Sequence, residues 1–146
     1  MLKKGLIALS IFGIILFVFC AFIFIPRTNA DKEDFSYNMN VSYIGESKII
    51  VTVELKNESF HTIRYASNVG GPIFVECIGE TESFSDDLNS GCEFGSLLPK
   101  QTIVYSQEYE LKEEKNQIRA LIIMSFHLNN VYFEINREIN NKDIEG

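Results

Sequence analysis

The sequence has few of the residues from which most catalytic and metal sites are built. It contains no tryptophan, two histidines and three cysteines. The absence of tryptophan excludes a core packed around a buried indole ring. The histidines, His61 and His127, are interpreted as surface imidazoles, and no GxSxG, HExxH, CxxC or phosphate-loop pattern occurs. We therefore predict that the protein is not an enzyme and binds no metal or cofactor.

Basic residues are also scarce. The chain has 13 lysines and arginines against 20 acidic residues, a net charge of -7. Lys3, Lys4 and Arg27 are the only charged residues before Asp31, so the remainder has ten basic and twenty acidic side chains and a net charge of -10. Such a surface repels a phosphate backbone, which excludes nucleic acid as the expected partner. It favours cations or basic protein surfaces.

No charge interrupts the apolar segment from Gly5 to Ile25. At about 1.5 Å per residue, a helix of this length crosses a hydrocarbon layer about 30 Å thick. Lys3 and Lys4 precede the segment and Asp31 follows it, which by the positive-inside rule places the N-terminus in the cytoplasm. We therefore predict a single-pass anchor over Gly5–Ile25, with the membrane as one partner and the remaining chain outside.

Two other interpretations of this segment stay open. Thr28-Asn29-Ala30 offers small residues at signal-peptidase positions, so residues 1–30 could instead be a signal removed after Ala30, leaving a secreted domain. Against cleavage, the apolar run exceeds the usual core of roughly 7 to 15 residues, and Arg27 stands between it and the cut. Cys20 follows Phe19, which is too large for a lipoprotein signal, so we interpret Cys20 as an apolar thiol within the anchor.

Beyond residue 30 the apolar pattern has period two. In residues 36–44, for example, Tyr37, Met39, Val41 and Tyr43 alternate with polar residues, as in a strand with one buried face. The same reasoning predicts strands at 36–44, 48–56, 60–66, 73–78, 102–111, 117–128 and 131–139. The 117–128 strand is apolar on both faces and is therefore expected to be central. A long irregular loop is expected before Leu97.

Seven antiparallel strands in about a hundred residues are typical of an immunoglobulin-like β-sandwich, although a small barrel shows similar alternation. We predict an all-β domain of this type over residues 36–140. A short stalk over 31–35 connects it to the N-terminal segment, and 141–146 form a flexible tail.

Two cysteines flank an acidic stretch, Cys77 to Cys92. Zinc needs four ligands and no other Cys or His lies nearby, so a zinc site is excluded. Outside the cytoplasm two such cysteines are expected to form a disulfide, which would close a loop of about 15 residues and stabilise the fold by about 3 kcal/mol. Two separate thiols, Cys77 in the core and Cys92 in the loop, remain the alternative.

The loops around these cysteines are the candidate partner surface. The acidic residues lack the DxDxDG spacing of a calcium loop, so we interpret them as a solvated, displayed surface. The candidate contact residues lie in loops 66–72 and 79–96: Asn68, Gly70, Glu80, Glu82, Asp86, Asp87 and Glu93.

Several of these segments resemble a known family. The succession VTVELKNESFHTIRYAS, IFVECI, LLPKQTIVYSQEYEL and IRALIIMSF, within about residues 48–128, resembles the BsuPI-type domain of intracellular proteinase inhibitors and their secreted immunoglobulin-like relatives. Leu97-Leu98-Pro99-Lys100-Gln101 is similar to the family's Leu-x-Pro-Gly-Glu turn, with Lys100 and Gln101 in place of Gly-Glu. The resemblance implies an immunoglobulin-like fold and a role in binding.

Together these features predict a membrane-anchored, extracytoplasmic module that binds another protein. Protease inhibition is one form of binding that the resemblance alone implies. The alternative is a structural or accessory subunit of a membrane or cell-envelope complex. A small-molecule ligand is not expected, because no set of convergent polar groups stands out in the sequence.

Overall fold

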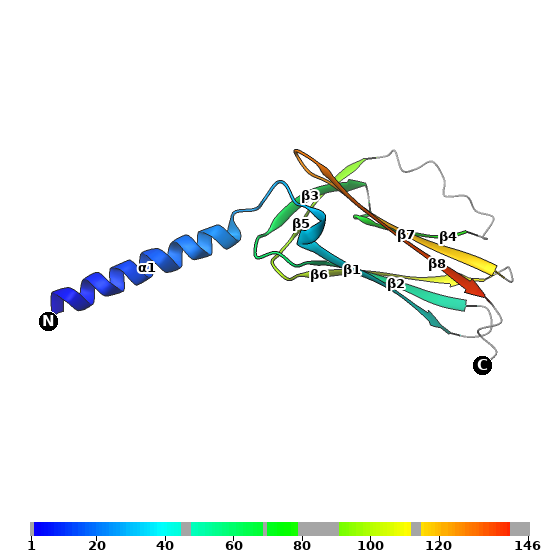
Figure 1. Ribbon diagram of the computed structural model, residues 1–146, viewed down its shortest axis with the longest axis horizontal. Coiled ribbons are helices and arrows are strands. Elements are labelled where there is room, and N and C mark those ends of the chain that lie inside the picture. Colours follow the sequence, from blue (N-terminus) through cyan, green and yellow to red (C-terminus); the bar gives the residue numbers. More distant parts are fainter. Residues whose placement is uncertain (1, 45–47, 69, 79–90, 112–114, 141–146) are drawn as a thin grey trace.

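The computed structural model describes residues 2–44, 48–68, 70–78, 91–111 and 115–140. Within these ranges the chain forms a helix, α1 (Leu2–Phe24), a short 3₁₀ turn, η1 (Lys32–Asp34), and eight strands in two sheets. Neighbouring strands within each sheet are antiparallel. Figure 1 shows the sheets as two layers, with α1 extending away from one end of them. The predicted all-β class of the domain is confirmed.

The smaller sheet has the strand order β1-β2-β6. Its strands are β1 (Phe35–Tyr43), β2 (Lys48–Asn57) and β6 (Thr102–Glu110). The central strand β2 buries one face completely, through Ile49, Val51, Val53 and Leu55. Because successive strand residues point to opposite faces, the period-two pattern was sufficient to predict this strand and its inward face.

The larger sheet is built around one long strand, β7. Its strands are β3 (Ile63–Asn68), β4 (Ile73–Ile78), β5 (Cys92–Leu97), β7 (Lys115–Ser125) and β8 (Asn130–Asn140). β8 pairs with β7 along its whole length, and β4 pairs with residues 117–122 of β7. β3 pairs with β7 at one position, Ala66 and Ser125, and its other edge pairs with β5. The prediction that the 117–128 strand is central is confirmed.

Buried residues of both sheets form a single core. From β7, the fully buried side chains are Ile118, Ala120, Ile122 and Met124. At one end of the core the Phe35 ring packs against Phe126 and Phe133, with ring centroids 6.4 Å and 6.3 Å away. Each fully buried Val, Leu or Ile contributes roughly 1.5–3 kcal/mol, so this core is the main source of stability.

One polar side chain, Asn57, is also fully buried, at the end of β2. Its amide nitrogen donates hydrogen bonds to the carbonyl oxygens of His61, Leu97 and Leu98, at 2.8, 3.1 and 3.0 Å. Its Oδ1 accepts hydrogen bonds from the backbone amide and the hydroxyl of Ser59, at 2.9 and 2.7 Å. Asn57 therefore satisfies its own polar atoms and joins the β2–β3 turn to the end of β5.

Helix α1 stands apart from the sheets in Figure 1. Its large apolar side chains that the structure describes, from Ile7 to Phe19, are exposed. Among the described residues, no helix is both long enough and apolar enough to cross a membrane.

The segment between α1 and β1 is in contact with the domain at Ala30. Ala30 is 2% exposed and belongs to the core, and Phe35 is already the first residue of β1. The Asn129 side chain donates a 2.6 Å hydrogen bond to the Ala30 carbonyl, which fastens this segment to the β7–β8 turn. Within residues 31–35, Lys32–Asp34 form η1 and Phe35 begins β1, so this short segment leads directly into the first strand.

Strand β5 was not predicted either. Residues 92–97 were expected to belong to a long loop, but they pair with β3 from Asn68↔Cys92 to Ile63↔Leu97. The side chains of β5 are mostly exposed, and Leu97 is its buried residue. An edge strand with so little burial shows no period-two apolar pattern, which explains why sequence reasoning missed it.

Candidate functional site

The larger sheet opens at one place, where β3 separates from β7 beyond the Ala66↔Ser125 pair. Residues 27–28 occupy the start of this opening. The Arg27 amide donates to the Thr62 carbonyl at 2.7 Å, and the Arg64 amide donates to the Arg27 carbonyl at 2.9 Å, so Arg27 forms a short parallel bridge with β3. The segment that leads out of α1 is thus built into the sheet.

The other side of the opening is bounded by the β7–β8 turn. The His127 amide donates a 3.1 Å hydrogen bond to the Thr28 carbonyl. Residues 27–28 are therefore held from both sides, by β3 and by the turn. The backbone of residues 27–28 thus bridges the gap between β3 and the β7–β8 turn, and side chains around it line a cavity.

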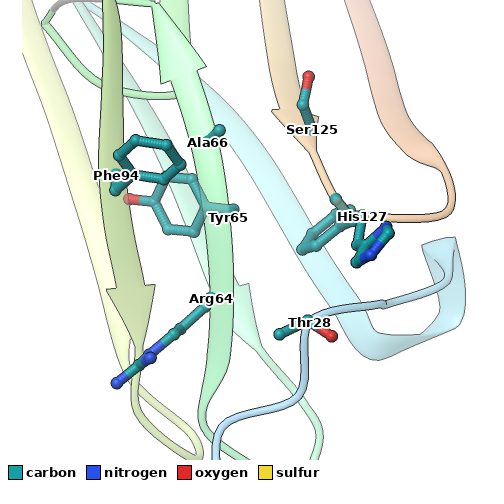
Figure 2. A pocket seen from close by; sticks show the side chains of 8 residues that line it. Thr28, Arg64, Tyr65, Ala66, Phe94, Ser125 and His127 are labelled. Atoms are coloured by element: carbon teal, nitrogen blue, oxygen red, sulfur yellow. The ribbon is translucent and has the colours of Figure 1, made fainter.

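The cavity has a volume of about 360 Å³ and is open to solvent. Its walls come from the α1–β1 segment, β3, β5 and the end of β7. The lining residues are Thr28, Arg64, Tyr65, Ala66, Phe94, Ser125, Phe126 and His127. Figure 2 shows Tyr65 and Phe94 together on one side, with Ser125 and His127 on the other. Residues from four separate parts of the chain thus form an aromatic site.

Tyr65 is positioned by a glycine on the neighbouring strand. Tyr65 and Gly95 are cross-strand partners, and a Cβ added to Gly95 would lie 2.9 Å from Cε2 of the Tyr65 ring. The ring therefore lies across Gly95, in space that any side chain would fill. Burial, and secondarily the Glu93 carboxylate, raise the pKa of the Tyr65 hydroxyl. The hydroxyl consequently stays protonated and able to donate a hydrogen bond.

Phe94 is the most exposed large apolar residue of the strands, at 84%. It lies on β5 opposite Ala66 of β3, at the rim of the cavity. In the described part of the chain, β5 pairs with β3 alone, so Phe94 projects from an edge strand. Such a side chain contributes little to folding and is available to a partner.

The structure brings together some of the predicted partner residues. Asn68 lies opposite Cys92, and the Gly70 amide donates to Glu93 Oε2 at 3.2 Å. Gly70 and Gly71 have φ values of +98° and +103°, which glycine adopts without strain. The other predicted residues lie outside the described ranges: Glu80, Glu82, Asp86 and Asp87.

The predicted disulfide between Cys77 and Cys92 is not formed. Cys77 is buried in β4 and pairs with Ile118 of β7, whereas Cys92 is exposed on β5 and pairs with Asn68 of β3. β8 pairs with residues 115–125 of β7, so β4 and β3 both lie along the other edge of β7, β4 at residues 117–122 and β3 at Ser125. Cys77 is level with Ile118 of β7, and Cys92 lies opposite Asn68, two residues from Ala66. At about 3.3 Å per residue the cysteines are therefore about 16 Å apart along the strands, well beyond the roughly 7 Å Cα separation that a disulfide tolerates. The prediction failed because the two cysteines, although close in sequence, lie on strands that do not pair with each other.

Among the described residues, no group of three or more His, Cys, Asp or Glu side chains is placed to hold a metal ion. His127 lines the cavity next to the hydroxyl-bearing Ser125 and Thr28, and it is exposed. The cavity therefore offers aromatic surface and hydrogen-bond donors, which suit binding.

Comparisons with known proteins give no family. No protein-family model and no curated protein matches the chain. Two solved structures of a beta-glucosidase from Kluyveromyces marxianus, one in complex with glucose and one selenomethionine-labelled, are similar at 15% and 12% identity, with TM-scores of 0.31 and 0.33. The matches cover 73% and 72% of this chain but 14% of each glucosidase chain. Similarity at this level carries no argument about fold or activity.

Sequence reasoning did not find this cavity, because its residues are far apart in the chain. Tyr65 and Phe126 look like ordinary strand residues, and Arg64 lies at an alternating polar position. One signal was available in the expected loop: Phe94, a large aromatic residue between Glu93 and Gly95.

Proposed function

We propose that this chain is a membrane-anchored, extracytoplasmic binding module whose cavity between β3 and β7 receives an apolar side chain of a partner protein. The observation that carries the proposal is the exposure of Phe94 at the rim of a cavity backed by Tyr65 and Phe126. Aromatic side chains beside an apolar pocket are typical anchors of protein interfaces.

The rim of the cavity supports a protein partner. Arg64 and His127 lie at its edge and are exposed. Both side chains donate hydrogen bonds, which suits the backbone carbonyls or carboxylates of a polypeptide. An apolar centre surrounded by exposed polar groups is the usual arrangement of a protein–protein contact.

The sheet arrangement supports the finer fold that we propose, an immunoglobulin-like sandwich. A three-stranded sheet, β1-β2-β6, and a five-stranded sheet of β3, β4, β5, β7 and β8 enclose one core, as the two sheets of such domains do. We extend this to the BsuPI-type resemblance and propose protease inhibition as one form of the binding role. Purified chain should then slow at least one member of a panel of secreted and cell-wall proteases, and no slowing across the panel would remove inhibition from the proposal.

The anchor is proposed from the sequence, which carries no charge from Gly5 to Ile25. The exposure of apolar side chains along α1, and the way α1 extends from the domain in Figure 1, support it. Exposing so much apolar surface to water is unfavourable, and burial of α1 in lipid would remove this cost.

The test is site-specific photo-crosslinking in the producing cell. A benzophenone amino acid is placed at Phe94 in the full chain, and a matched variant carries it at Val104, an exposed residue of β6 in the other sheet. We expect a discrete protein adduct from position 94 and none from position 104. Identical adducts at both positions, or none at position 94, would overturn the assignment of the cavity as a partner site.

A second candidate function is supported by α1. Its described side chains expose apolar residues at consecutive positions, including Phe17, Val18 and Phe19, so more than one helix face could contact neighbouring helices of a complex. Replacing residues 5–25 by an unrelated spanning helix should leave crosslinking from Phe94 unchanged if the domain alone binds. Loss of the adduct after this exchange would favour an accessory subunit that assembles through its helix.

A further inference from the structure

Three turns lie at the end of the domain from which α1 emerges. They connect β2 to β3 (58–62), β5 to β6 (98–101) and β7 to β8 (126–129), and Figure 1 shows all three beside the segment that leaves α1. We call them together the helix-proximal end. The Asn57 side chain links the first turn to the second through its hydrogen bond to the Leu98 carbonyl.

Each of these turns exposes one large apolar side chain. Phe60 is 72% exposed, Leu98 is 51% exposed and Leu128 is 78% exposed. None of the three belongs to the core. A single exposed apolar residue needs no explanation, but three turns that present one each at the same end form an apolar surface.

A lysine accompanies this surface. Lys100 Nζ lies 4.8 Å from the centroid of the Phe60 ring and 3.3 Å from Glu58 Oε2. Aromatic rings and lysines with apolar stems are favoured at the boundary between lipid and water, where the stem or ring meets apolar chains and the charge stays hydrated. The composition of the helix-proximal end therefore suits a lipid headgroup layer.

The connection to α1 leaves the domain little freedom. α1 ends at Phe24, and Arg27 is already hydrogen-bonded to β3, so only Ile25 and Pro26 lie between. Three Cα steps reach at most about 11 Å. The headgroup layer on each side of a bilayer is about 5–7 Å thick. If α1 spans the bilayer, the helix-proximal end has to lie at the headgroups.

We propose that the helix-proximal end rests on the membrane surface, with Phe60, Leu98 and Leu128 inserted at headgroup level. This inference rests on the anchor of the proposed function. Beyond the anchor, the inference gives the domain one orientation: the helix-proximal end contacts the bilayer and the opposite end points away from it. Apolar insertion drives the contact, because the net charge of -10 beyond residue 30 disfavours attraction to anionic lipids.

The absence of tryptophan makes a sharp experiment possible. A single tryptophan introduced into the full chain is a unique fluorescent probe. Two variants, Phe60→Trp and Leu128→Trp, report on the helix-proximal end. The matched control is Tyr43→Trp, at the end of β1, which begins at Phe35 opposite Asn57. At about 3.3 Å per residue, position 43 lies about 26 Å further along the strand.

Each variant is reconstituted into phosphatidylcholine vesicles with and without brominated acyl chains. We expect bromine to quench Phe60→Trp and Leu128→Trp roughly twofold or more relative to Tyr43→Trp, because quenching requires close approach to the acyl chains. Two probe positions ensure that one misfolded variant does not decide the result. Repeating the measurement with one-quarter phosphatidylglycerol should leave the quenching unchanged, and quenching only in anionic vesicles would overturn the apolar mechanism.

The outcomes separate the two proposals. Vesicle flotation after alkaline extraction reports the anchor by itself. If the chain floats but the helix-proximal probes are quenched no more than Tyr43→Trp, the surface contact is wrong and the anchor stands. If the chain does not float, both are wrong. Probes whose emission is blue-shifted without bromine quenching would show that a protein covers this end, which also overturns the contact with lipid.

Discussion

The backbone amide of Arg27 donates a 2.7 Å hydrogen bond to the carbonyl of Thr62. This bond joins a residue near the N-terminal helix to the residue just before β3, the strand that lines the cavity. The Arg27 side chain also lies 3.5 Å from Asp34 in η1. The chain between α1 and β1 is consequently part of the domain. Cleavage after Ala30, the alternative interpretation of the N-terminal segment, would therefore remove residues that the folded domain contacts.

A chain that begins at Asp31 should be less stable than one that begins at Pro26. It loses the buried Ala30 and the hydrogen bonds that residues 27–30 make with β3 and with the β7–β8 turn. With each bond contributing about 1 kcal/mol, we expect a loss of about 2–4 kcal/mol, measured by urea unfolding. Equal stability of the two chains would show that residues 26–30 are dispensable, and mass analysis of the mature protein reports whether the cell removes them.

Asn57→Ala should be strongly destabilising. The substitution removes the donor that satisfies the carbonyls of His61, Leu97 and Leu98, and it leaves buried polar groups without this partner. We expect a loss of about 2–4 kcal/mol in the free energy of unfolding. Asn136→Ala, on the exposed face of β8, is the matched control and should change stability by less than about 0.5 kcal/mol. A similar small change at Asn57 would contradict the role assigned to it.

Gly95→Ala should disturb the cavity through Tyr65. The added methyl group overlaps the ring, so Tyr65 has to move and the domain should lose about 1–3 kcal/mol. In a double-mutant cycle the same change in a Tyr65→Ala background should cost much less, because the space is then empty. Additive effects of the two substitutions would show that the ring does not depend on Gly95.

The Glu58 carboxylate should titrate at unusually low pH. Hydrogen bonds from Lys56 and then from Ser36, with Lys100 adding to them, lower its pKa from 4.5 to about 2. Because the folded pKa lies below the unfolded value, the stabilisation is fully present above about pH 4.5 and is lost as the pH falls through about 2. An NMR titration should show the Glu58 pKa rising in Lys56→Met and unchanged in Lys48→Met, whose lysine pairs with Glu108.

The two domain cysteines should differ in reactivity. In a Cys20→Ala background, a thiol reagent should label exposed Cys92 in the native chain without reduction, and buried Cys77 only after unfolding. Mass spectrometry counts the labels. An unreduced chain that takes up no label even when unfolded would demonstrate the disulfide that the strand order argues against.

The local apolar pattern was sufficient to predict a strand wherever that strand buries one face along its length. Strand β2 follows from the alternation of Ile49, Val51, Val53 and Leu55, and the central position of β7 follows from its apolar residues on both faces. β5 has only Leu97 buried, so its sequence carries no such pattern. It is held in place by hydrogen bonds to β3, which depend on backbone position and leave no trace in residue type.

The sequence by itself determined the separation of an uncharged apolar segment from an acidic, strand-rich domain, because charge and period-two burial are properties of neighbouring residues. Only the tertiary structure decided which strands lie side by side. That arrangement keeps Cys77 away from Cys92, inserts Arg27 beside Ile63 and assembles Tyr65, Phe94 and His127 around one cavity. Pairings between distant segments depend on how the two sheets close over their common core, which no local pattern encodes.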